Sequence, residues 1–187
     1  TPPAVLQDAA IWLTAEKNVS VDGAGSVTGW YDARESSAAA VNYGYAAANS
    51  YVSESVKGAA VSTFGDKPAL SFVEYVSGLH KSLELKTAAG ADASYAMCDA
   101  FYVMALDGNI SFAPVLGNKS SGYFFTNPGR GTVLSADGNA LWQAYQCEFR
   151  HNGAVADPTV ALGANKKHLC EFTTCPGHTI PIDSIFR

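Results

Sequence analysis

Short runs rich in Val, Ile, Phe, Tyr and Thr recur along the chain, and turn residues separate them. Runs of this kind, bounded by Gly, Asp, Asn and Pro, are typical of β-strands. They occupy 10–14, 26–32, 68–73, 82–86, 99–106, 121–126, 141–150, 166–174 and 180–186. Turn signals such as "DGAG", "FGDKP", "NPGRG" and "HNG" lie between them. This pattern predicts an all-β fold with two antiparallel sheets packed face to face.

Alternation along the strands predicts which side chains face inward. In 142–150, Cys147 and Phe149 share one side, and the charged Glu148 lies on the other. Successive side chains of a strand point to opposite faces, so we expect the Phe149 face inward and the Glu148 face outward. The same rule places Cys170 and Phe172 on one face. In 26–32 it separates Trp30 from Tyr31.

One stretch has helical propensity, the Ala-rich "ESSAAAVNYGYAAANSYVSESV" at 35–56. Its Asn, Gly and Ser residues favour a long loop or a short helical turn over a full helix.

Length and charge limit the class of protein. The chain has 187 residues, of which 16% are charged, and a net charge of -5. We expect one domain over 1–187. The longest basic cluster is Lys166-Lys167, so the sequence disfavours nucleic acid and anionic membranes as partners. No apolar run approaches the ~20 residues of a membrane span. The start resembles no signal segment, and we read the chain as a mature product.

The cysteines indicate an extracytoplasmic protein. An even set of four allows three pairings, and we expect one or two disulfides, with reduced buried thiols as the alternative. The set is Cys98, Cys147, Cys170 and Cys175. N-x-S sequons begin at Asn18, Asn109 and Asn118, and they matter only in a host that glycosylates secreted chains.

Metal binding has weaker support. His168, Cys170, Cys175 and His178 are of zinc-ligand type, but the Cys spacing is wider than a common knuckle, which favours a disulfide. The turns "DGAG", "LDGN" and "SADGN" contain oxygen ligands suited to calcium, which is the alternative ion. The same sequences are equally well explained as turns without a metal. We therefore predict no cofactor.

Taken in order, several segments resemble one known superfamily. These are "AIWLTAEKNVSVDGAGSVTGWYDAR", "GDKPALSF", "DAFYVMAL", "SFAPVLGNKSSGYFF", "FRHNGAVADP" and "PIDSIFR". Over residues 10–187 the chain resembles the concanavalin A-like lectin/glucanase superfamily, and most closely its bacterial laminin-G-like jelly-roll domains. The resemblance implies an antiparallel two-sheet jelly roll that binds carbohydrate or protein, or acts as a spacer in adhesins. Some members bind calcium and some hydrolyse glycans.

The resemblance also carries expectations for particular residues. It implies a Cys98 to Cys170 disulfide, which leaves Cys147 and Cys175. The rival is Cys170 to Cys175 together with Cys98 to Cys147. In the resembling domains the tryptophan of this segment packs within the sandwich and the Asp after it begins a turn, which implies a structural Trp30. We therefore expect Asp32 and Arg34 to anchor the following loop, and alternation leaves Tyr31 facing outward.

Resembling domains usually continue past "IDSIFR" into a closing strand. The protein is then trimmed at this point, takes its last strand from another chain, or continues further. A missing closing strand would leave a sheet edge open for self-association.

Catalysis is not indicated. Hydrolases of the resembling fold carry an E-x-D-x-E strand, which this sequence lacks. The nearest substitute is Glu148 with Glu171, in the two Cys-Glu-Phe repeats, and solvated surface glutamates are the favoured interpretation. No catalytic residue is predicted.

Loop aromatics and polar residues are the expected ligand contacts, because an exposed ring can lie against a sugar while Asn or Arg binds its hydroxyls. The candidates are Tyr43, Tyr45, Tyr51, Asn118, Tyr123, Asn127 and Arg130. We predict a secreted or cell-surface binding and adhesion domain that recognises carbohydrate or a surface protein. The second hypothesis is a structural subunit of a surface assembly or filament, and the third is a glycan hydrolase.

Overall fold

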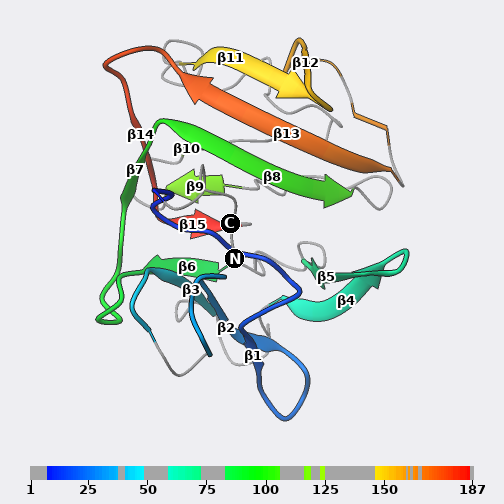
Figure 1. Cartoon of the computed structure of the whole chain (residues 1–187), viewed down its shortest axis with the longest axis vertical. Helices are drawn as coiled ribbons and strands as arrows, with labels where there is room; N and C mark the ends of the chain where they lie inside the picture. The colour runs from blue at the N-terminus through cyan, green and yellow to red at the C-terminus, as the bar shows by residue number, and fades with distance from the viewer. Residues whose placement is uncertain are drawn as a thin grey trace. The chain divides into compact units, whose positions relative to one another are not determined.

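The computed structural model describes residues 8–37, 41–48, 59–72, 83–105, 116–118, 123–124, 146–158, 160, 162–163 and 166–185. All regular elements in these segments are β-strands, and every strand pair whose register the structure gives is antiparallel (Figure 1). The all-β prediction is therefore confirmed for the described residues. The chain divides into two compact units, residues 1–94 with 183–186 and residues 95–182 with 187.

In the first unit, five strands lie side by side in the order β1-β2-β3-β6-β15. Their bounds are β1 Val19–Val21, β2 Val27–Tyr31, β3 Tyr45–Ala48, β6 Leu83–Lys86 and β15 Ser184–Ile185. The buried apolar side chains of this sheet are Val27, Ala46, Leu83, Leu85 and Ile185. A separate hairpin joins β4 (Ala60–Phe64) and β5 (Lys67–Ser71), and Gly65 supplies the positive φ of its turn.

Gly29 in β2 allows a close approach by an aromatic ring. A Cβ at this position would lie 2.7 Å from the ring of Tyr31, which is too close for any side chain. The Tyr31 ring also stacks on that of Tyr45, with centroids 4.8 Å apart. Tyr31 is therefore half-buried on the sheet, and the prediction that it faces outward is wrong. Trp30 is also half-buried, and its indole N–H donates to the Thr14 carbonyl at 2.9 Å, which suits a structural role.

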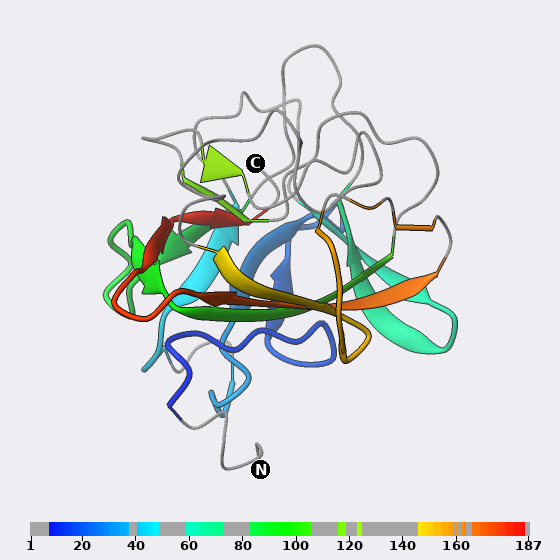
Figure 2. The ribbon, with the colours of Figure 1, turned by 90° about the horizontal axis from the view of Figure 1, so that it is seen from above.

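The second unit contains a sheet in the order β12-β11-β13-β8. Its bounds are β8 Asp99–Ala105, β11 Gln146–His151, β12 Ala154–Val155 and β13 Lys167–Thr174. In Figure 1 β8, β13 and β11 run side by side, and Figure 2 shows the same strands from above. Two further pairs join β7 (Tyr95–Met97) to β14 (Ile180–Ile182) and β9 (Leu116–Asn118) to β10 (Tyr123–Phe124).

Alternation along β13 explains the core of this unit. Cys170 and Phe172 are buried, while Glu171 faces the other side, as predicted. The Phe172 ring lies between those of Tyr102 and Phe149, at centroid distances of 6.1 Å and 4.8 Å. One aromatic side chain from each of β8, β13 and β11 thus forms a row across the sheet. Burial of each such ring stabilises a fold by roughly 1.5–3 kcal/mol.

Several predicted element types or boundaries were wrong. Residues 10–14, predicted as a strand, form no ladder. The Trp12 N–H donates to the Asp32 carboxylate, and the Trp12 carbonyl accepts from the Ala33 N–H in a neighbouring turn. Part of the predicted loop at 35–56 is a strand, β3, held between β2 and β6. The predicted strand 180–186 is interrupted at Asp183, so that β14 pairs with β7 and β15 with β6.

Candidate functional site

Asp32 organises the turn that follows β2. Its carboxylate is fully buried and accepts hydrogen bonds from the backbone N–H groups of Trp12, at 2.7 Å, and Arg34, at 2.9 Å. The guanidinium of Arg34 adds two contacts of 2.8 Å, one to each carboxylate oxygen. Burial alone would raise the pKa of Asp32, but the hydrogen bonds from Arg34 and Trp12 outweigh it and the pKa lies below its usual value. Asp32 is therefore a permanent anion at neutral pH.

Arg34 connects this turn to Tyr43. Its guanidinium carbon lies 4.0 Å from the centroid of the Tyr43 ring, a cation–π geometry. The forked contact with Asp32 fixes the plane of the guanidinium, and it raises the pKa of Arg34. One face of the Tyr43 ring is thus positioned by a cation that a buried carboxylate holds in place.

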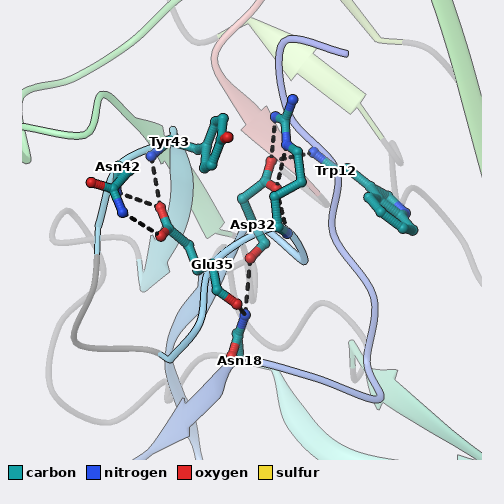
Figure 3. A network of polar contacts seen from close by, with 7 residues as sticks. Trp12, Asn18, Asp32, Glu35, Asn42 and Tyr43 are labelled. Carbon is teal, nitrogen blue, oxygen red and sulfur yellow. Dashed lines mark hydrogen bonds and ion pairs between the residues drawn. The ribbon is translucent and has the colours of Figure 1, made fainter. Parts of the chain in front are cut away.

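Glu35 fixes the backbone of the segment that carries Tyr43, which we call the Tyr43 loop (residues 41–44). The buried Glu35 carboxylate accepts from the backbone N–H groups of Asn42 and Tyr43, the latter at 2.7 Å, and from the Asn42 side-chain amide at 3.0 Å. Figure 3 shows Glu35 pointing toward both residues of the loop. A charged acceptor for two loop N–H groups holds this backbone more firmly than a neutral one would.

Asn18 closes the network from the other side. Its side-chain nitrogen donates to the carbonyl oxygens of Asp32 and Glu35, both at 3.0 Å (Figure 3). Its φ of 59° lies in the left-handed region, which asparagine tolerates better than most residues. The turn at 32–35 is therefore hydrogen-bonded through its side chains and its carbonyls.

The network presents Tyr43 to solvent. The residue is 38% exposed, and Asn42 beside it is also exposed. An aromatic ring on a fixed backbone, next to a side-chain amide and a guanidinium, can contact the apolar face of a sugar and its hydroxyls together. Tyr45, the neighbouring candidate, belongs to β3 and stacks on Tyr31, so it is part of the sheet.

The other predicted contact residues divide into two groups. Asn118 and Tyr123 are brought together in the second unit as directly paired residues of β9 and β10, although their side chains lie outside the description. Tyr51, Asn127 and Arg130 lie outside the described residues.

The expected disulfides are not present among the described cysteines. Cys98 and Cys170 carry free thiols, and neither bonds to Cys175. The backbone explains this, since the Thr174 N–H donates to the Cys98 carbonyl and places Cys98 four positions along the ladder from Cys170. That displacement is about 13 Å, whereas a disulfide needs Cα atoms within about 7 Å. The predicted Cys98 to Cys170 and Cys170 to Cys175 pairings are wrong.

The rival Cys98 to Cys147 pairing meets a similar obstacle. Gln146 lies opposite Thr174 on one side of β13, and Cys98 lies beside Thr174 on the other. Two strand spacings separate such positions by about 10 Å. The side chain of Cys147 itself is outside the description.

Histidines form a pair on the inner face of the second sheet. His151 Nε2 lies 2.9 Å from His168 Nδ1, and His168 Nε2 lies 2.7 Å from the Gly163 carbonyl. The carbonyl can only accept, so His168 donates through Nε2, and in its neutral form it accepts from His151 through Nδ1. Burial, and the neighbouring His168, lower the pKa of His151.

The candidate ligands that the structure describes do not gather into a metal centre. Within the described segments no group of three or more His, Cys, Asp or Glu side chains is placed to hold a metal ion. His178, the last member of the zinc-type stretch, is exposed in the turn after β13. In "DGAG" the Asp22 carboxylate accepts from two backbone N–H groups of its own turn. The turns "LDGN" and "SADGN" lie outside the described residues.

The two outer glutamates lie on adjacent strands, with Arg150 next to both. Glu148 pairs in register with Thr173, and Glu171 pairs with Arg150, so the glutamates are diagonal neighbours. The Arg150 Nε lies 2.5 Å from Glu148 Oε1, an ion pair. This pairing suits a solvated surface more than an acid and a nucleophile facing one bond.

Sequence reasoning missed the hydrogen bonds between Glu35 and Asn42, which lie just before the unpredicted strand β3. It also missed Phe101 and Val103, which are exposed on β8. The alternation of Ala100, Tyr102 and Met104 with these two residues was the available signal.

No described helix has the length and apolar character needed to cross a bilayer. No family model, curated protein or solved structure matches the chain.

Proposed function

We propose that the chain is a jelly-roll domain of the concanavalin A-like type, exported to the cell surface or beyond. In this proposal it binds a carbohydrate or another surface ligand without catalysis, through the Tyr43 loop. The observation that carries the proposal is the exposed Tyr43 ring on a loop whose N–H groups a buried Glu35 holds. Antiparallel sheets and the lack of an E-x-D-x-E strand support it further.

The Tyr43 loop is suited to binding because its conformation is preorganised before a ligand binds. Ordering a flexible side chain on binding costs about 0.5–1.5 kcal/mol, and ordering a flexible loop costs more. Arg34 against one face of the Tyr43 ring, and Glu35 beneath its backbone, reduce that cost. The face of the Tyr43 ring opposite Arg34 is then the stacking surface for a sugar, and the ring hydroxyl lies at its border.

A glycan array followed by calorimetry on the best ligand tests the proposal. Tyr43→Ala is expected to weaken binding about tenfold, equivalent to ~1.4 kcal/mol, because the stacking surface is removed. Tyr43→Phe is expected to retain most of the affinity. Val61→Ala is the matched control, since Val61 is also exposed in the first unit but lies on the separate hairpin.

Two results would contradict the proposal. One is an array without signal for the intact chain, and the other is equal affinity for wild type and Tyr43→Ala. Release of reducing ends from a bound glycan, abolished by Glu148→Gln or Glu171→Gln, would instead support the hydrolase hypothesis.

A further inference from the structure

Among the described strands, β8 lies at the edge of the sheet in the second unit. Within the described residues its paired neighbour is β13, in an unbroken antiparallel register from Asp99 to Ala105. The Thr174 N–H donates to the Cys98 carbonyl at 2.8 Å, which orients that carbonyl toward β13. Backbone groups alternate between the two sides of a strand. Asp99, Phe101, Val103 and Ala105 therefore direct their N–H and C=O groups to the outer edge.

The outer side of β8 is also apolar. Phe101 is 63% exposed and Val103 is 68% exposed, whereas Leu169, opposite Val103 on the interior strand, is 37% exposed. Exposed apolar surface thus increases toward the edge. Natural edge strands are usually protected by Lys, Pro or a bulge, and β8 contains none of these. Its one charged residue is Asp99, at its start.

We propose that β8 pairs antiparallel with β8 of a second copy of the chain, about a two-fold axis at Tyr102. In this register Phe101 lies opposite Val103 of the second copy, and Val103 lies opposite its Phe101. Aromatic with β-branched pairs are favourable across antiparallel strands. The register also matches the outward backbone groups of both strands, which would form up to about eight hydrogen bonds.

Charge selects the antiparallel arrangement. Each Asp99 would lie opposite Ala105 of the second copy, so the two carboxylates stay about 20 Å apart along the strands. Parallel pairing in register would place the two Asp99 side chains next to each other, which is unfavourable. The two-fold arrangement is closed, since each β8 edge is used once, so it predicts a dimer and not a filament.

Sedimentation equilibrium of the full chain, over about 1–300 µM, tests the proposal. The expected result is a monomer–dimer equilibrium. Val103→Lys is expected to raise the dimer Kd at least tenfold, because it places a charge opposite Phe101 of the second copy at two symmetric positions. Val103→Thr keeps the side-chain shape and is expected to raise the Kd by a smaller factor.

Val155→Lys is the matched control. Val155 is the same residue type, is 66% exposed and lies on β12 at the opposite edge of the same sheet. Its Kd is expected to stay within about twofold of wild type.

A wild-type monomer throughout the range overturns the proposal. So does a Val103→Lys Kd equal to that of Val155→Lys, and so does an assembly larger than a dimer. Circular dichroism shows whether each variant is folded. If Val103→Lys is unfolded, the dimer Kd of Val103→Thr provides the test. The outcome is independent of ligand binding by the Tyr43 loop, which lies in the other unit.

Discussion

The buried ion pair of Asp32 with Arg34 makes the sharpest test of the network. Asp32→Asn preserves shape but replaces one carboxylate oxygen with an NH₂ group. Each oxygen accepts two hydrogen bonds, one from a backbone N–H and one from the Arg34 guanidinium. In either orientation of the new amide, its NH₂ group, a donor, faces one backbone N–H and one guanidinium N–H, which are also donors. The guanidinium of Arg34 also loses its counter-charge.

The size of the effect follows from burial. Asp32 is fully buried and the Arg34 side chain nearly so, so water cannot replace the lost contacts. Removal of one partner of such a pair costs about 3–5 kcal/mol, in contrast to about 0–1 kcal/mol for a surface pair. We expect Asp32→Asn to lower the free energy of unfolding by ~3 kcal/mol. The double variant Asp32→Asn with Arg34→Met should recover part of this loss, because the unpaired charge is removed.

Urea unfolding followed by tryptophan fluorescence measures the effect, since Trp12 and Trp30 lie within or beside the network. The pH dependence gives a second readout. The folded pKa of Asp32 lies below its ordinary value of 3.8, so its stabilisation is complete above that pH and is lost as the pH falls through the folded pKa. Asp32→Asn should lack this loss. A cost below about 1 kcal/mol, or the same loss of stability in acid for Asp32→Asn and wild type, would contradict a stabilising buried ion pair.

The remaining predictions concern single groups. Burial raises the pKa of the Cys170 thiol to about 11, so Ellman's reagent should modify the exposed Cys98 rapidly and Cys170 only at the rate of unfolding; equal rates would contradict this. Folding lowers the pKa of His151 below 6.5. The stabilisation from neutral His151 is therefore complete above pH 6.5 and is lost as the pH falls toward the folded pKa. Between pH 7.5 and pH 5, urea midpoints should show a larger loss of stability for wild type than for His151→Gln. Gly29→Ala should destabilise the first unit by about 1–3 kcal/mol, because the new Cβ meets the Tyr31 ring at 2.7 Å; a thermal midpoint equal to wild type would show that the ring moves aside without cost.

Local pattern was sufficient where one strand carries its own signal. The alternation at 167–174 predicted the buried Cys170 and Phe172 correctly, because a two-residue period is set by the backbone of the strand itself. Pairings that depend on register were out of reach. The separation of Cys98 from Cys170 follows from how β8 aligns with β13, and residue order along one strand does not encode that alignment.

The candidate site shows the same division. Tyr43 was predicted from its residue type, but the carboxylate beneath it was not. Glu35 reaches Asn42 only because the chain turns back between β2 and β3, and β3 lies in an Ala-rich stretch with helical propensity. Neighbouring strands, and not intrinsic preference, determine the structure there.

The Asn18 amide has a consequence for producing the protein. Asn18 begins an N-x-S sequon, and an oligosaccharyltransferase attaches its sugar to the nitrogen that donates to the Asp32 and Glu35 carbonyls. That nitrogen has two hydrogens, and both are in use. A glycan added during synthesis would displace one of them and introduce a large polar group into the turn. A eukaryotic secretory host should therefore yield less native protein from the wild-type gene than from one encoding Ser20→Ala, which removes the sequon and keeps the asparagine.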